Sequence, residues 1–225
     1  MIKNLGKWVY HNVPVTQPFL KKINNYFNKP PDLVWQFTTL PWMDDPKISH
    51  YLDGVNEIKN FEFDSKVSAK TNDSIDVYRF RHWYVSFAVR HAIHFANSDS
   101  DFVECGVSLG WTALFTLKEI GNHKLHLYDA WGPMLKENLT SSEYLRIGKY
   151  KDLDVNITKR NLSKYSSNTI YHVGSIPNIL QDKPLLKNIP YLHIDVNASK
   201  TTLEILEFFY PKLKKCCYSF RRLRS

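Results

Sequence analysis

The sequence predicts an α/β protein with a Rossmann-like, mostly parallel β-sheet. Short apolar runs alternate with segments of helical composition after residue 76, and strands that alternate with helices are typical of a parallel sheet. Several of the apolar runs end on glycine or an acidic residue. Such residues are common at the carboxyl ends of strands that face a ligand. In the clearest unit, residues 101–131, Gly106 precedes Asp129 by 23 residues. This interval is close to the roughly 20 residues of a nucleotide-binding βαβ unit.

Composition and charge limit the functional classes. The chain has 225 residues, 43% of them apolar, which predicts one soluble domain with a sizeable core. Six basic and no acidic residues lie in 211–225, so only +2 of the net charge of +8 belongs to the rest of the chain. A nearly neutral body argues against a nucleic-acid-binding face. The sequence shows no secretory signal, no apolar run near the roughly 20 residues of a membrane span, and only three cysteines, so we expect a cytoplasmic protein.

Three parts differ in composition. Residues 1–75 are rich in aromatic residues and proline and lack regular periodicity, which predicts an irregular or partly helical N-terminal cap. Residues 76–215 form the expected Rossmann-like domain. Residues 216–225 form a tail of aberrant composition.

The main domain opens with an amphipathic helix over residues 76–97, for which Asp76 is the expected N-cap. Apolar side chains recur at intervals of three to four residues, which predicts one buried face. The residues assigned to that face are Val77, Phe80, Tyr84, Phe87, Ala88 and His91.

A strand, a turn, a helix and a second strand follow. The first strand contains Phe102 and Val103, the helix occupies 111–120 before a Gly-Asn stop, and the second strand, 125–128, ends at Asp129.

Two more strands and a helix complete the predicted domain. Residues 132–168 are polar and predict no regular element. The third and fourth strands, 169–173 and 191–194, end at Gly174-Ser175 and at Asp195. A helix over 200–214 is expected to bury Leu203, Leu206, Phe209 and Leu213.

The loop between Gly106 and Gly110 has the chemistry of a nucleoside-cofactor site. Glycines let the backbone approach a ligand, a helix amino terminus offers free N–H groups, and Asp129 could bind ribose hydroxyls. The spacing is not G-x-G-x-x-G, so a dinucleotide pyrophosphate is poorly accommodated. Glu104 could hold a cationic amine, so S-adenosylmethionine, which has an amine and a sulfonium but no phosphate, fits better than NAD. An ordinary strand-to-helix turn is the alternative.

Four segments in order carry a resemblance to a known family: FVECGVSLGWTAL, LHLYDAW, VGSIPNIL and YLHIDVNASKTTLEILEFFYPKL. Together they resemble the macrocin O-methyltransferase (TylF/MycF-like) family of class I S-adenosylmethionine-dependent methyltransferases, over roughly residues 79–214. The resemblance implies the three-layer class I methyltransferase fold.

The resemblance also implies the site residues. The first segment would grip the methionine part of the cofactor, the second its ribose and the third its adenine, while Asp195 would be catalytic and would help to hold Mg²⁺ that orients the acceptor hydroxyls. Trp111 would shield the cofactor or pack the helix. The residues expected at the cofactor are Glu104, Cys105, Gly106, Gly110, Trp111, Asp129, Ala130, Gly174 and Ser175.

The chain departs from the family pattern after the fourth strand. The family shows D-V-D-L-Y-E-S-T, with two aspartates followed by a tyrosine–glutamate pair. In this chain Asn197 replaces the second aspartate, and the tyrosine–glutamate pair is missing. After PKL the family continues with a glycine pair, a fifth strand and D-D-Y, whereas this chain ends CCYSFRRLRS.

The tail suggests a frameshift. Residues 216–225 can be encoded by a set of codons that, read one base later, encodes V-V-I-L-F-D-D-Y-G. That peptide would be a buried strand followed by the missing acid pair, so we hypothesise a frameshift near Lys215. About four of the seven class I strands are then identifiable, and the fourth strand is an apolar edge unless 216–220 stands in as a short fifth strand. Three arginines, Arg221, Arg222 and Arg224, would replace the metal-binding acids and abolish divalent binding.

The sequence therefore predicts an S-adenosylmethionine-dependent O-methyltransferase that acts on a sugar or another small-molecule hydroxyl, with reduced or no activity in this chain. A homo-oligomer is compatible with this interpretation; nucleic acid and membrane are not expected as partners. Two alternatives stay open: a non-catalytic fragment with at most residual cofactor binding, and an NAD-dependent oxidoreductase.

Overall fold

The computed structural model describes residues 44–62, 79–181, 186, 188–213 and 218–220. The chain divides into two compact units, Met1–Asp45 and Pro46–Ser225, and the second contains every element described below. Most of the predicted cap, 1–75, lies outside the described residues.

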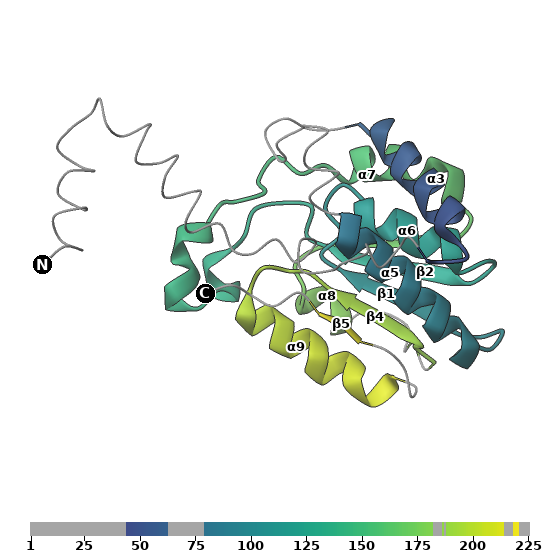
Figure 1. Ribbon diagram of the computed structural model, residues 1–225. Helices are drawn as coiled ribbons and strands as arrows, with labels where there is room; N and C mark the ends of the chain where they lie inside the picture. Colours follow the sequence, from purple (N-terminus) through teal and green to yellow (C-terminus); the bar gives the residue numbers. More distant parts are fainter. Residues whose placement is uncertain (1–43, 63–78, 182–185, 187, 214–217, 221–225) are drawn as a thin grey trace, which may run out of the picture. The chain divides into compact units, whose positions relative to one another are not determined.

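A parallel five-stranded sheet with the order β3-β2-β1-β4-β5 is the centre of the second unit (Figure 1). The predicted α/β class and its four strands are confirmed. The strand order reverses between β1 and β4, as it does at the ligand-binding crevice of Rossmann-like folds, with which the arrangement is compatible. The strands are β1 (Asp101–Cys105), β2 (Lys124–Asp129), β3 (Thr169–Val173), β4 (Tyr191–Ile194) and β5 (Tyr218–Phe220).

The strand β5 covers the edge of β4. Ser219 pairs with His193 in a parallel register, so the backbone groups on this side of β4 have partners. The short stand-in strand expected from 216–220 is therefore present at its last three residues. Arg221, Arg222 and Arg224 lie outside the described residues.

Helices cover both faces of the sheet, giving three layers (Figure 1). Alternate strand side chains point to opposite faces, so Phe102 and Leu125 join one core cluster while Val103 and Leu192 join the other. The first face is covered by α3 (Ile48–Lys59), α5 (Arg79–Ala92) and α6 (Trp111–Glu119), and the second by α8 (Asn178–Gln181) and α9 (Ser199–Phe209).

The buried face of α5 differs from the predicted one. Tyr84 and Phe87 are 41% and 51% exposed, and His91 is also exposed, whereas Val85 and Val89 are buried with Ala88 and Ala92. Only Ala88 of the described residues in the predicted set is buried. These alanine and valine side chains face the core together with the buried ring of His82. Residues 76–78 lie outside the described part of the chain.

The last helix is shorter and rotated relative to the prediction. It ends at Phe209, since Pro211 cannot continue a helix, and Leu213 instead pairs with Ile189 in an isolated parallel bridge. Its buried side chains include Ile205 and Phe209, while Leu203 is exposed.

Residues 132–168 contain short helical elements that the sequence did not predict. These are η4 (Lys136–Asn138), η5 (Ser141–Arg146), α7 (Val155–Asn161) and η6 (Ser163–Tyr165). Within the described residues, no helix is long and apolar enough to cross a membrane.

Candidate cofactor pocket

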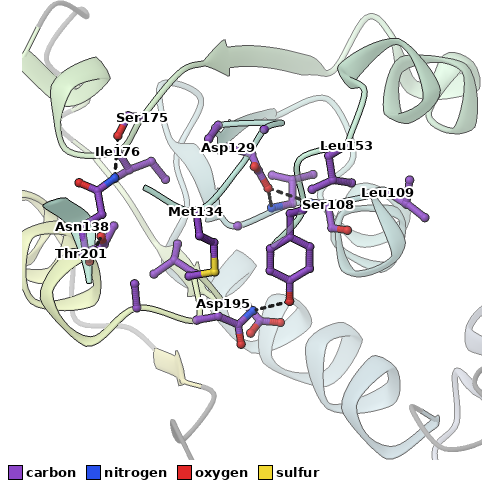
Figure 2. A pocket seen from close by; sticks show the side chains of 18 of the residues that line it. Ser108, Leu109, Asp129, Met134, Asn138, Leu153, Ser175, Ile176, Asp195 and Thr201 are labelled. Carbon is purple, nitrogen blue, oxygen red and sulfur yellow. Dashed lines mark hydrogen bonds between the residues drawn. The ribbon is translucent and has the colours of Figure 1, made fainter. Parts of the chain in front are cut away.

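A cavity of about 290 Å³ lies at the carboxyl edge of the sheet, where the strand order reverses (Figure 2). The loops that follow β1, β2, β3 and β4 all contribute to its wall. Ligands of open α/β sheets bind in this crevice. The topology therefore brings together four loops that are far apart in the sequence.

Gly106 allows the first and fourth loops to meet. Its φ is +86°, and an added Cβ would lie 2.3 Å from the carbonyl oxygen of Asp195. Any side chain at this position would therefore collide with backbone as well as being strained. The sequence predicts close approach of this glycine to a cofactor; in the structure the close neighbour of Gly106 is the backbone of the loop after β4.

Asp129 fastens the loop after β1. Its Oδ2 accepts hydrogen bonds from the backbone N–H groups of Val107 and Ser108 at 2.7 and 2.9 Å, and its Oδ1 accepts one from Trp131 at 2.8 Å. Burial raises the pKa of Asp129, and these three N–H groups oppose that rise. Asp129 lines the cavity, as a residue predicted to bind ribose would, and it also shapes the loop after β1.

Glu104 lies beneath the pocket and does not line it. Its carboxyl group is fully buried and accepts a hydrogen bond from the Thr112 hydroxyl in the first turn of α6. The other carboxyl oxygen, Oε2, is 3.9 Å from His193 Nδ1. In this structure Glu104 therefore supports the start of α6, and only its partner Thr112 reaches the cavity.

The other expected cofactor residues divide into two groups. Cys105, Gly110 and Gly174 do not line the cavity, and burial raises the pKa of the Cys105 thiol well above its usual value. The expected residues that do line the cavity are Gly106, Trp111, Asp129, Ala130, Ser175 and Asp195.

Asp195, the expected metal ligand, forms an ion pair with Arg81 of α5. The Arg81 Nη2 atom lies 2.7 Å from Asp195 Oδ2. Among the described residues, no three His, Cys, Asp or Glu side chains come together as metal ligands. A Mg²⁺ ion at Asp195 would therefore have to displace the Arg81 guanidinium and take most of its oxygen ligands from water or substrate, so the described residues fit such a site poorly.

Helix α5 supplies two pocket residues that the sequence did not indicate, Arg81 and His82. His82 is buried and stacks on Phe115 with a centroid distance of 4.7 Å. Burial, together with the charges of Arg81 and His193, lowers the pKa of His82 to about 3, so the imidazole is neutral at pH 7. No spacing in the sequence linked this helix to loops more than 20 residues away.

Residues 132–150 form the outer wall of the cavity. Met134, Leu135, Asn138 and Tyr150 line it. Backbone hydrogen bonds between Met134 and Lys149, and between Gly148 and Met134, close this segment on itself at 2.9 and 3.0 Å. Because these contacts are between loops, periodicity gave no sign of them.

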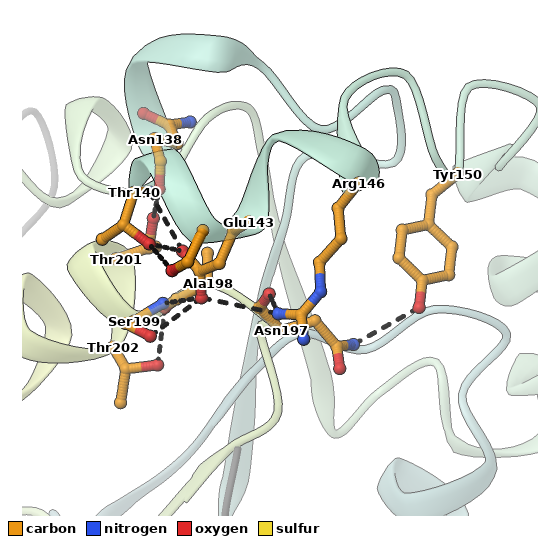
Figure 3. Close-up of polar contacts among 11 residues, drawn as sticks. Asn138, Thr140, Glu143, Arg146, Tyr150, Asn197, Ala198, Ser199, Thr201 and Thr202 are labelled. Carbon is orange, nitrogen blue, oxygen red and sulfur yellow. Dashed lines mark hydrogen bonds and ion pairs between the residues drawn. The ribbon is translucent and has the colours of Figure 1, made fainter. Parts of the chain in front are cut away.

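Glu143 and Arg146 of η5 hold this wall to the start of α9 and to the loop after β4 (Figure 3). Glu143 Oε1 accepts hydrogen bonds from the backbone N–H and the hydroxyl of Ser199 at 3.0 and 2.8 Å. Arg146 Nη1 donates to the carbonyl oxygen of Asn197 at 2.6 Å. Burial raises the pKa of Glu143, but hydrogen bonds from Thr140 and Ser199 outweigh it and lower the pKa to about 2.

Asn138 makes a second connection, to the loop after β3. Its Nδ2 donates to the Ser175 hydroxyl at 2.9 Å. The outer wall is therefore held to two of the four strand loops that form the cavity.

A scan against protein-family models finds no match for this chain, and a search of curated proteins finds no match either.

Proposed function

We propose that the chain binds S-adenosylmethionine in this cavity and is an S-adenosylmethionine-dependent O-methyltransferase that acts on a small-molecule hydroxyl, in keeping with the resemblance noted in the sequence. The observation that carries the proposal is a cavity at the switch point of a parallel sheet whose wall contains two carboxylates, Asp129 and Asp195, and one permanent cation, Arg81.

Charge favours this cofactor over a dinucleotide. The single arginine of the wall is already paired with Asp195, so the described lining residues leave an excess of negative charge. A ligand with a sulfonium and an ammonium group is attracted to such a wall, whereas a pyrophosphate is repelled by it. The absence of a G-x-G-x-x-G pattern after β1 supports the same choice.

The lining residues suggest how the cofactor would be held. The loop that begins at Gly106 would face its methionine part, Asp129 and Ala130 its ribose, and Ser175 with Ile176 its adenine. The wall at 132–150 would shield it from water. When bound, the cofactor supplies an activated methyl group on a sulfonium.

The chain's own contribution is alignment. Methyl transfer is an in-line displacement, so catalysis depends mainly on placing the acceptor oxygen behind the methyl carbon. The acceptor would enter beside Asp195 and Tyr150, where the cavity wall is polar. A sugar hydroxyl is the acceptor that the family resemblance suggests.

Calorimetric titration tests the proposal. We expect micromolar binding of S-adenosylmethionine and S-adenosylhomocysteine and no heat with NADH. Heat with NADH alone would favour the oxidoreductase alternative, and no heat with any of the three would favour the non-catalytic fragment. Transfer of a radiolabelled methyl group to a panel of glycosides then tests the acceptor class.

A further inference from the structure

We infer that the cation at Asp195 is the Arg81 guanidinium and that this pocket takes no divalent metal ion. As a statement about methyl transfer, the inference rests on the proposed function. As a statement about cation binding, it rests on the described side chains alone.

The ion pair joins two elements that are 114 residues apart. The Asp195 side chain is 9% exposed and that of Arg81 is 32% exposed, so the 2.7 Å contact lies partly out of water. Charge-assisted hydrogen bonds of this length are among the strongest in proteins. A divalent ion at Asp195 would have to displace the guanidinium and would then face its positive charge at short range.

The loop after Asp195 does not complete a metal site. Asn197 supplies a neutral amide two residues later, and its Nδ2 donates to the Tyr150 hydroxyl at 3.4 Å (Figure 3). The carbonyl oxygen of Asn197 already accepts a hydrogen bond from Arg146, whose Nη1 also lies 3.4 Å from Glu143 Oε1. Magnesium sites in proteins use one or two carboxylates with water or substrate oxygens, and here the Asp195 carboxylate is already engaged by the Arg81 guanidinium.

The exchange of metal for arginine has a functional consequence. A guanidinium stays charged throughout the accessible pH range and cannot be removed by a chelator. Arg81 also fixes the orientation of the Asp195 carboxylate toward the cavity. Any methyl transfer by this chain is therefore expected to be insensitive to EDTA and to added Mg²⁺.

Electron paramagnetic resonance with Mn²⁺ tests metal binding directly on the full chain. We expect no saturable binding up to about 1 mM Mn²⁺, the weak end of protein sites for hard cations. Saturable binding at micromolar concentration that Asp195→Asn abolishes would overturn the inference. Since the measurement needs no cofactor, it decides the inference even if S-adenosylhomocysteine does not bind and the proposed function fails.

A double-mutant cycle tests the ion pair itself. Arg81→Gln and Asp195→Asn are each expected to lower the melting temperature by about 3 to 6 °C, and the double variant by clearly less than the sum. Arg160→Gln, which breaks the exposed pair with Glu62, is the matched control and is expected to change it by less than about 2 °C. Additive effects of the two pocket substitutions would contradict the assignment of Arg81 to Asp195.

Discussion

Gly106 shows how one residue determines the shape of the pocket. The loops after β1 and β4 approach each other there, and the positive φ and the Asp195 carbonyl both exclude a side chain. We expect Gly106→Ala to lower the free energy of unfolding by about 3 kcal/mol and to abolish cofactor binding. The added methyl group would force the loops after β1 and β4 apart.

Gly148→Ala is the control for this substitution. Its φ is +75°, but an added Cβ would meet nothing within 4 Å. This variant should carry only the conformational cost of about 1 kcal/mol. Urea denaturation and calorimetric titration measure both effects, and equal losses for the two variants would contradict the close approach at Gly106.

His82 makes stability depend on pH. Its pKa falls from 6.5 to about 3 on folding, so below pH 6.5 the unfolded chain binds a proton that the folded chain does not. Stability from this group is complete above pH 6.5 and declines as the pH falls toward 3. Between pH 6.5 and about pH 5 the loss should be about 2 kcal/mol.

The measurement is urea denaturation at both pH values for the wild type, His82→Gln and His91→Gln. The first substitution should remove this part of the pH dependence. His91 is exposed on the same helix, so its substitution should leave the dependence as in the wild type. An unchanged slope in His82→Gln would rule out His82 as its source.

At the scale of elements, α5 turns its alanine and valine side chains to the core and leaves the rings of Tyr84 and Phe87 exposed. Val89→Ala should therefore cost about 2 kcal/mol, because it leaves a cavity at a fully buried position. Phe87→Ala should cost less than about 1 kcal/mol although it removes a larger side chain, since half of the ring is exposed. If denaturation experiments show a larger loss of stability for Phe87→Ala than for Val89→Ala, the buried face is the one predicted from periodicity.

The element η5 holds the outer wall of the pocket through Glu143. Glu143→Gln retains the shape but removes the charge from four hydrogen bonds to Thr140 and Ser199, so we expect a loss of about 2 kcal/mol in stability and weaker cofactor binding. Glu137→Gln, exposed in the neighbouring η4, is the control.

The same carboxyl group gives a second pH effect, at acidic pH. Because the pKa of Glu143 is lowered from 4.5 to about 2, its stabilising contribution is present above pH 4.5 and lost as the pH falls from 4.5 to 2. Titration of the wild type and Glu143→Gln through this range checks the assignment. Parallel curves would mean that the Ser199 contacts do not persist in solution.

At the scale of the whole molecule, the cofactor should stabilise the folded chain. At a concentration 100 times its dissociation constant, S-adenosylhomocysteine should contribute about 2.7 kcal/mol and raise the melting temperature by about 5 to 10 °C. Gly106→Ala should show no such increase if the cavity is the binding site. An equal increase in that variant would place the cofactor elsewhere.

The α/β class, the four first strands and the acidic or glycine residue at the end of each could be predicted from local sequence. Apolar runs, glycine stops and strand-to-helix spacing are properties of residues close together in the sequence. They can therefore be identified without knowledge of the fold. The same locality explains the errors on α5 and α9. A helical apolar stripe shows that one face is buried, but the packing of α5 on α6 selects which residues belong to it.

The sequence by itself determined a βαβ unit with Gly106 in the turn after its first strand and Asp129 at the end of its second strand. Only the tertiary structure decided what surrounds them: Asp195 is paired with Arg81, Glu104 is buried against α6, and Glu143 connects the outer wall to the start of α9. These contacts join residues up to 114 positions apart. They depend on the order of the strands and on side-chain packing, which no local pattern encodes.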